Sequence, residues 1–340
     1  MDLKIVVERN VPFIAATLRA SGITVTELAA GEIDRAAMAD ADALVTRTRT
    51  RCDASLLEGS RCTLVASATI GLDHVDCEWC RSAGIEVANA PGCNAPAVAQ
   101  YVISTLVAAF GPDLSGRTLG VVGVGHVGSI VSRWARQAGM EVLECDPPRQ
   151  RAEGGGFTDL ATVAARADAI TFHVPMTRVG EDATWHLADE RFFSLLRKQP
   201  LIINTARGPV VDNHALLAAL DSGLVGKAAI DCWEGEPEIS RELLRKAFVA
   251  TPHIAGYSHS GKARASQMAL DAICRHFGLP RLTIDEPVAP YAPDGLTAQE
   301  IAESYDPVAD SEALRREPGD FEKLRNTYAL RPEAGENRRE

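Results

Sequence analysis

Aromatic residues and cysteines are scarce in this 340-residue sequence. Phe, Trp and Tyr together make up 5% of it, and its eight cysteines are widely spread. So few cysteines exclude a disulfide-stabilised secreted scaffold. The closest pair, Cys77 and Cys80, has no second nearby pair of ligands to complete a zinc site. We therefore expect reduced thiols and no metal site.

Positive charge is also in short supply, with 35 basic against 46 acidic side chains and a formal net charge of −11. This balance argues against nucleic acid as a partner, because no basic stretch could hold a phosphate backbone. The first ten residues carry charges and no apolar segment of a secretory signal. The most apolar helix candidate, residues 95–110, is too short to cross a bilayer. We expect a cytoplasmic protein with no membrane partner.

Strand and helix patterns alternate along most of the chain, which predicts α/β architecture with parallel sheets covered by helices. The first series of expected strands is Leu3–Val7, Thr24–Leu28, Ala43–Val45, Leu64–Ser67 and Glu86–Ala88. The second is Thr118–Val122, Glu141–Cys145, Ala169–His173, Leu201–Asn204, Ala228–Asp231 and Val249–Ala250. Six strands separated by helices match the two mononucleotide-binding halves of a Rossmann-type doubly wound domain.

A glycine-rich turn follows the first strand of the second series. Gly123, Gly125 and Gly128 have the GxGxxG spacing, in which the glycines permit a tight turn, close approach of a pyrophosphate and close packing of the helix on the strand. Asp146 ends the next strand, where a carboxylate accepts hydrogen bonds from the ribose of NAD rather than NADP. A glycine turn alone is weak evidence, but the strand, the helix and the acid together favour an NAD site.

Three later segments, each after a strand of the second series, carry Arg207, Glu236 and His253. Ligands of open α/β sheets bind at these carboxyl ends. Oxidation of a secondary alcohol by NAD needs a base for the hydroxyl proton, and histidine suits that role. An arginine can hold a substrate carboxylate, and a carboxylate can fix the histidine tautomer. Each residue alone could be a cap or a turn, but the set predicts hydride-transfer chemistry.

The ordered motifs GVGHVG…D, NTARG, DCWEGEP and TPHIAG resemble those of the D-isomer-specific 2-hydroxyacid dehydrogenase family. The resemblance implies active-site roles for Arg207 and Glu236, and His253 as proton acceptor. It implies NAD contacts from Gly123, Gly125, His126, Val127, Gly128, Asp146, Asp231 and Gly256. It implies substrate contacts from Thr48, Thr69 and Tyr257.

Longer segments at 69–76, 90–95, 145–148 and 253–257 resemble one subfamily, in which the implied substrate is 4-phospho-D-erythronate and the implied assembly is a homodimer. The order of elements and the resemblance together imply that the Rossmann domain is inserted into a smaller, flavodoxin-like α/β substrate domain. The expected limits are 1–94 and 258–284 for the substrate domain and 95–257 for the NAD-binding domain.

Residues 285–340 differ in composition from the rest. They hold six prolines and fourteen acidic against seven basic residues, a net −7. This composition predicts a solvated, partly disordered tail, although 321–328 is a short amphipathic stretch that could dock. Against the subfamily, the tail lacks room for the last part of a C-terminal dimerisation module. A second departure is Val7-Glu8-Arg9-Asn10, where the family usually shows an Asp-Glu-Asn run.

The phosphate of such a substrate needs a cationic pocket in the first domain. Arg47, Arg49 and Arg51 follow the strand at 43–45, and alternation would place them on one side if the strand continued. Arg47 is the favoured phosphate ligand. Two other interpretations stay open: a dehydrogenase of the same family for another 2-hydroxy acid, and an NAD(H)-sensing binding protein.

Overall fold

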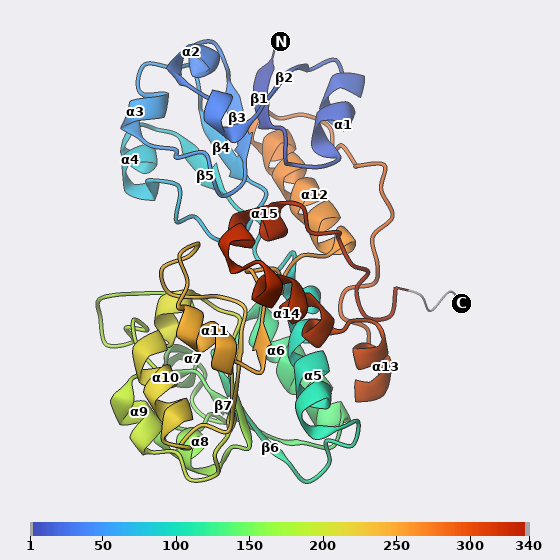
Figure 1. The fold of residues 1–340 in the computed structure, drawn as a ribbon. Helices are drawn as coiled ribbons and strands as arrows, with labels where there is room; N and C mark the ends of the chain where they lie inside the picture. The colour runs from blue at the N-terminus through green and yellow to red at the C-terminus, as the bar shows by residue number, and fades with distance from the viewer. Residues whose placement is uncertain (1–2, 337–340) are drawn as a thin grey trace. The chain divides into compact units, whose positions relative to one another are not determined.

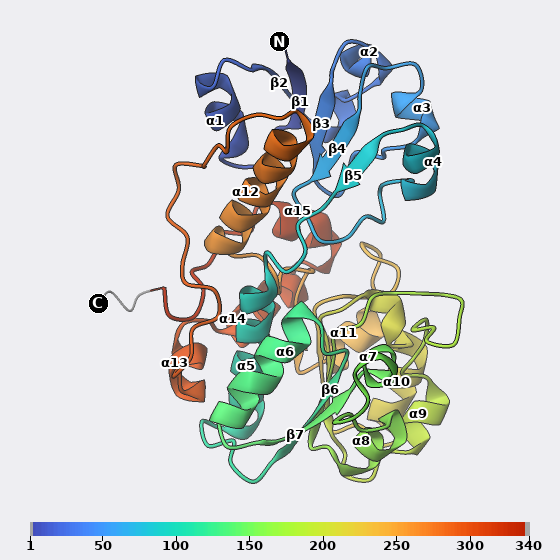
Figure 2. The same cartoon turned by 180° about the vertical axis from the view of Figure 1, so that it is seen from behind.

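The computed structural model describes residues 3–336, which fall into two compact units (Figures 1 and 2). Of the described residues, unit 1 comprises 3–94 and Ser258–Ala289, and unit 2 comprises Ala95–Tyr257 and 290–336. Among the described helices, none is both long enough and apolar enough to cross a membrane.

Unit 1 is built on a five-stranded parallel sheet in the order β2-β1-β3-β4-β5. Its strands are β1 (Lys4–Glu8), β2 (Thr24–Leu28), β3 (Ala43–Thr46), β4 (Leu64–Ser67) and β5 (Glu86–Ala88). One face packs against α1 (Ile14–Ala20) and α12 (His259–His276), and the other against α2 (Arg35–Met38), α3 (Ala54–Leu57) and α4 (Cys77–Ser82). The strand order is that of flavodoxin-like folds, as expected.

Unit 2 contains a six-stranded parallel sheet in the order β11-β10-β9-β8-β6-β7. The strands are β6 (Thr118–Val122), β7 (Glu141–Cys145), β8 (Ala169–Phe172), β9 (Leu201–Asn204), β10 (Lys227–Ile230) and β11 (Val249–Ala250). The strand order reverses between β6 and β8, and such a switch point is where ligands of open sheets bind.

The helices of unit 2 cover both faces of this sheet. One core contains side chains of α5 (Ala95–Phe110) and α6 (His126–Gln137). The opposite core contains side chains of α8 (Leu160–Arg166), α9 (Glu190–Ser194), α10 (Asn213–Asp221) and α11 (Arg241–Lys246). In α6 the apolar residues Ile130, Val131 and Trp134 recur at helical spacing and are all buried, which explains why this segment lies on the sheet.

The acidic C-terminal segment differs from the expected solvated tail. It forms α13 (Ala298–Glu303), α14 (Pro307–Arg316) and α15 (Phe321–Asn326), which Figure 1 shows in red as a run of short helices. Leu314 and Phe321 enter one core of unit 2, while Ile301 and Tyr305 enter the other. A few apolar residues at helical spacing are sufficient to order this segment, because they pack into the two large cores of unit 2.

Candidate active site

The glycine turn after β6 is shaped by two close approaches and one open space. Gly123 has φ +89°, and a Cβ there would lie 2.8 Å from the backbone of His173. A Cβ on Gly128 would lie 2.0 Å from the carbonyl oxygen of Gly123. A Cβ on Gly125 would meet nothing within 4 Å, so its missing side chain leaves space at the N-terminus of α6. That space and the N–H groups of the first helical turn fit a pyrophosphate.

Asp146 lies beside this turn, at the end of β7 and the start of α7 (Pro147–Glu153). Its Oδ2 accepts a hydrogen bond from Val124 N at 2.8 Å, and its Oδ1 accepts one from Arg149 N at 3.1 Å. Each oxygen keeps lone-pair capacity for a ribose hydroxyl. His126 and Val127 form the first turn of α6. The residues at this edge therefore fit a dinucleotide, with its diphosphate at the helix and a ribose at Asp146.

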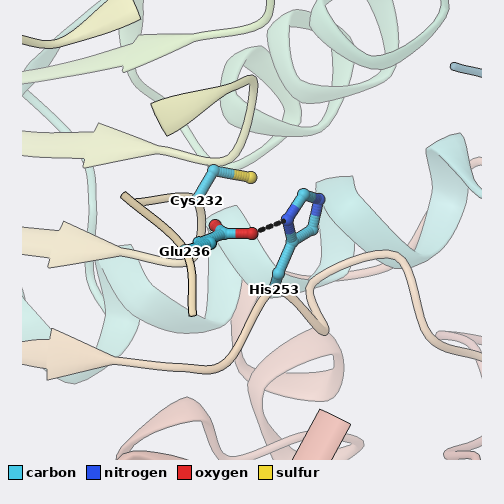
Figure 3. Close-up of side chains that lie close together, drawn as sticks. All are labelled: Cys232, Glu236 and His253. Carbon is cyan, nitrogen blue, oxygen red and sulfur yellow. Dashed lines mark hydrogen bonds and ion pairs between the residues drawn. The ribbon is translucent and has the colours of Figure 1, made fainter. Parts of the chain in front are cut away.

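His253 and Glu236 form the centre of the second part of the site. Nδ1 of His253 lies 2.8 Å from Oε2 of Glu236, and Figure 3 shows the carboxylate directed at the ring, with Cys232 beside the pair. The other carboxylate oxygen of Glu236 accepts a hydrogen bond from Trp233 N at 2.7 Å. Both oxygens are thus engaged, which fixes the orientation of the carboxylate and of the imidazole bonded to it.

The electrostatic surroundings keep Glu236 ionised. Burial by itself raises the pKa of this carboxyl, but His253, the Trp233 N–H and the nearby Arg325 outweigh burial, and the net pKa is lowered. An ionised carboxylate stabilises positive charge on the imidazole to which it is bonded. The pair is therefore suited to a histidine that receives a proton.

Arg207 lies at the end of β9, where the chain passes very close to the loop after β10. A Cβ on Gly208 would lie 1.9 Å from the carbonyl oxygen of Trp233, so only glycine permits this approach. The Arg207 guanidinium acts electrostatically on Cys232, which follows β10. These contacts bring Arg207, Glu236 and His253 to one edge of the unit 2 sheet.

Cys232, Glu236 and His253 also have the donor types of a metal site, and their atoms lie within 4.8 Å of one another. Burial raises the pKa of the Cys232 thiol well above its usual range, so the thiolate that a metal prefers is disfavoured. Nδ1 of His253 is already bonded to Glu236. The arrangement suits proton transfer better than metal ligation.

Asp231, which the family resemblance assigns to the cofactor, is 1% exposed. Its carboxylate accepts hydrogen bonds from the hydroxyl of Thr251 and the N–H groups of Ile254 and Ala255, at 2.7 to 3.0 Å. Its backbone carbonyl accepts one from His253 N at 2.9 Å. Asp231 therefore holds the loop that carries His253 and Gly256, and a cofactor contact remains a prediction.

Two arginines of the C-terminal segment adjoin this site, and the sequence analysis did not identify either. Arg325 of α15 is half-buried, and its side chain bonds to Tyr257 and lowers the pKa of Glu236. Arg331 is 6% exposed and contacts the same loop. The amphipathic stretch at 321–328 was the one indication in the sequence that this segment packs on the rest of the protein. It predicted docking, but not that these arginines adjoin the site.

The substrate residues expected in unit 1 lie near the ends of β3 and β4. β3 ends at Thr46, so the strand does not continue and alternation does not align the three arginines. Arg47 donates to the carbonyl of Asn10 at 3.4 Å, and Arg51 pairs with Asp53 at 2.5 Å. Thr48 is exposed, whereas the Thr69 hydroxyl bonds to Ser67 at 2.8 Å.

Glu8 organises the loop that carries Arg47. Its side chain is 1% exposed, and Oε2 accepts hydrogen bonds from the hydroxyls of Thr46 and Thr50 and from Arg47 N, at 2.9 to 3.2 Å. The residue lies in the Val7–Asn10 segment where this sequence departs from the family pattern. In the sequence, the indication that Glu8 organises a loop was that this acidic residue directly follows an apolar strand.

Several known proteins are similar in sequence to this chain. Residues 99–255 match the D-isomer specific 2-hydroxyacid dehydrogenase, NAD binding domain. Erythronate-4-phosphate dehydrogenase of Bacteroides thetaiotaomicron is 45% identical, covering 97% of each chain. The Escherichia coli protein of the same name is 40% identical, covering 97% of this chain and 92% of its own. This chain belongs to the D-isomer-specific 2-hydroxyacid dehydrogenase family.

Membership confirms the predicted fold class, the NAD cofactor and the activity of an NAD-dependent dehydrogenase. A solved 2-hydroxyacid dehydrogenase from Ketogulonicigenium vulgare superimposes with a TM-score of 0.69 at 28% identity, covering 83% of this chain and 98% of its own. This chain and that dehydrogenase thus share the same overall fold.

Proposed function

We propose that this dehydrogenase oxidises 4-phospho-D-erythronate to 3-hydroxy-2-oxo-4-phosphooxybutanoate, a step in the biosynthesis of pyridoxal 5′-phosphate. The names of the relatives at 40% and 45% identity support this substrate. The observation that carries the mechanism is the 2.8 Å contact between His253 Nδ1 and Glu236.

His253 takes the proton of the substrate hydroxyl in this mechanism. Because Glu236 engages Nδ1, the nitrogen that remains for the proton is Nε2, and the imidazolium that forms is stabilised by the adjacent carboxylate. Arg207 holds the substrate carboxylate and polarises the carbonyl that forms at C2. NAD, when bound, accepts the hydride that leaves C2.

The cofactor and substrate contacts are assigned as the family motifs imply. Gly123, Gly125, His126, Val127 and Gly128 bind the diphosphate. Asp146, Asp231 and Gly256 complete the NAD site. In unit 1 the substrate phosphate is assigned to Arg47. Thr48 and Thr69 of unit 1 and Tyr257 of unit 2 are assigned as further substrate contacts. We also propose a cytoplasmic homodimer.

The alternative class, an NAD(H)-sensing binding protein, has no need for a histidine paired with a carboxylate. The test is NADH production on a panel of 4-phosphoerythronate, 3-phosphoglycerate, lactate and glycerate. We expect strong preference for 4-phosphoerythronate. Preference for an unphosphorylated acid would show that 4-phosphoerythronate is not the substrate. If no acid is oxidised and NADH still binds, the NAD(H)-sensing protein is favoured. In the same assay His253→Gln should abolish turnover and leave NADH binding nearly unchanged.

A further inference from the structure

Arg331 uses every N–H group of its buried guanidinium, and all five acceptors are neutral. Nε donates to the side-chain oxygen of Gln100 at 3.2 Å, and Nη2 donates to Ala97 O at 3.1 Å and to Ala255 O. Nη1 donates to Ile254 O and Tyr257 O, both at 3.1 Å. An arginine carries five such donors in a rigid plane, so this site is fully matched to it.

Three of these five acceptors belong to the loop that directly follows His253. The same loop is held from its N–H side by Asp231, which accepts from Ile254 N at 2.7 Å and Ala255 N at 3.0 Å. The backbone N–H and C=O groups of Ile254 and Ala255 thus lie between a buried carboxylate and a buried guanidinium. Charge-assisted hydrogen bonds of this kind are stronger than those between neutral groups.

The position of His253 depends on this loop. His253 has φ +58°, in the left-handed region that a residue other than glycine occupies only when its surroundings enforce it. Its own N–H is bonded to Asp231 O at 2.9 Å, and the next two residues are bonded on both sides. Loosening the loop would let the backbone relax and move the imidazole away from Glu236.

We propose that Arg331 is a positioning residue for the proton acceptor: it holds the Ile254–Tyr257 loop against Asp231 and thereby keeps His253 in its left-handed conformation. The inference rests on the proposed role of His253. It gives the C-terminal segment a part in catalysis in addition to its part in the core of unit 2.

The test compares Arg331→Met and Arg331→Lys with the native protein, on whichever acid of the panel the native protein oxidises. Met keeps the length of the side chain without a donor, and Lys keeps the charge but cannot reach five acceptors. We expect kcat per NADH-binding site to fall at least tenfold for Met and by less for Lys. We also expect faster amide hydrogen exchange in 253–257 and a larger isotope effect with substrate deuterated at C2, since chemistry becomes limiting.

Arg315 offers a matched control, because it is also an arginine of the C-terminal segment that donates to backbone carbonyls. It contacts Leu244 O at 2.7 Å and Phe248 O at 3.3 Å, away from the His253 loop. Arg315→Met should lower Tm and leave kcat per NADH-binding site, the isotope effect and exchange in 253–257 within twofold of native values.

Native kcat per site and native exchange in Arg331→Met would overturn the proposal, as would equal losses in the two Met variants. If Arg331→Met does not fold, Arg331→Lys decides by the same readouts. If the native protein oxidises no acid of the panel, the proposed function is wrong instead. Amide exchange in 253–257 then still tests whether Arg331 holds this loop.

Discussion

The Nδ1 atom of His253 lies 2.8 Å from Oε2 of Glu236, although the two residues are seventeen positions apart and β11 lies between them in the sequence. Glu236→Gln would keep the shape of the pair but remove the negative charge that stabilises the imidazolium. We expect kcat to fall by roughly 10²- to 10⁴-fold, the range of general acid–base catalysis, with NADH affinity almost unchanged. Steady-state kinetics and NADH fluorescence measure the two quantities. Native kcat in this variant would exclude Glu236 from the mechanism.

Arg325 should contribute to the acid limb of the pH profile by helping to keep Glu236 ionised. It contributes to the lowered pKa of Glu236, and a carboxylate with a lowered pKa stays ionised to lower pH. Arg325→Met should therefore raise the pKa of Glu236, and kcat should begin to fall at a higher pH on the acid side. The profile of kcat between pH 4 and 8 checks this shift. Arg325→Lys keeps the charge and should shift the limb less; an unmoved limb in both variants would show that Arg325 does not act on Glu236.

Gly125 and Gly128 should respond differently to the same substitution. In Gly125→Ala the new Cβ meets nothing within 4 Å, so stability should be unchanged while the methyl occupies the space proposed for the pyrophosphate. We expect KM for NAD to rise about tenfold, equivalent to about 1.4 kcal/mol. Kinetics at varied NAD and a thermal melt measure the two effects.

Gly128→Ala places a Cβ 2.0 Å from the carbonyl oxygen of Gly123, so the backbone of the turn must move. Overpacking of this kind costs about 1–3 kcal/mol, and the melting temperature should fall. If Gly125→Ala left KM for NAD unchanged, the open space at Gly125 would not be a cofactor site.

Arg47 should discriminate phosphorylated from unphosphorylated acids. Arg47→Ala is expected to raise KM for 4-phosphoerythronate at least tenfold, because a charge-assisted contact to phosphate is lost, and to leave KM for glycerate within about twofold. Arg49→Ala is the matched control, since its side chain is exposed on the same loop. Equal effects on both acids would remove Arg47 from the phosphate site.

Much of the fold could be predicted from sequence because local patterns of apolar and polar residues specify its strands and helices. Short apolar runs alternating with amphipathic segments located all eleven strands within one residue at each end, as β6 and β7 illustrate. The GxGxxG spacing and the motifs around Arg207, Glu236 and His253 identified the family, since each motif occupies a few consecutive residues at the end of one strand.

Only the tertiary structure shows which residues, distant in the sequence, contact the motif residues and hold them in place. Arg325 and Arg331 lie in an acidic, proline-containing segment whose average composition predicts disorder. A composition average cannot show that Arg331 is buried and Arg325 half-buried. Their partners are Tyr257, Glu236 and backbone carbonyls that have no sequence pattern. Burial creates these interactions, because a guanidinium withdrawn from water must find acceptors wherever the folded chain presents them. The sequence by itself thus predicted the chemistry that we propose for the site, and the folded chain decided which residues hold the site in place.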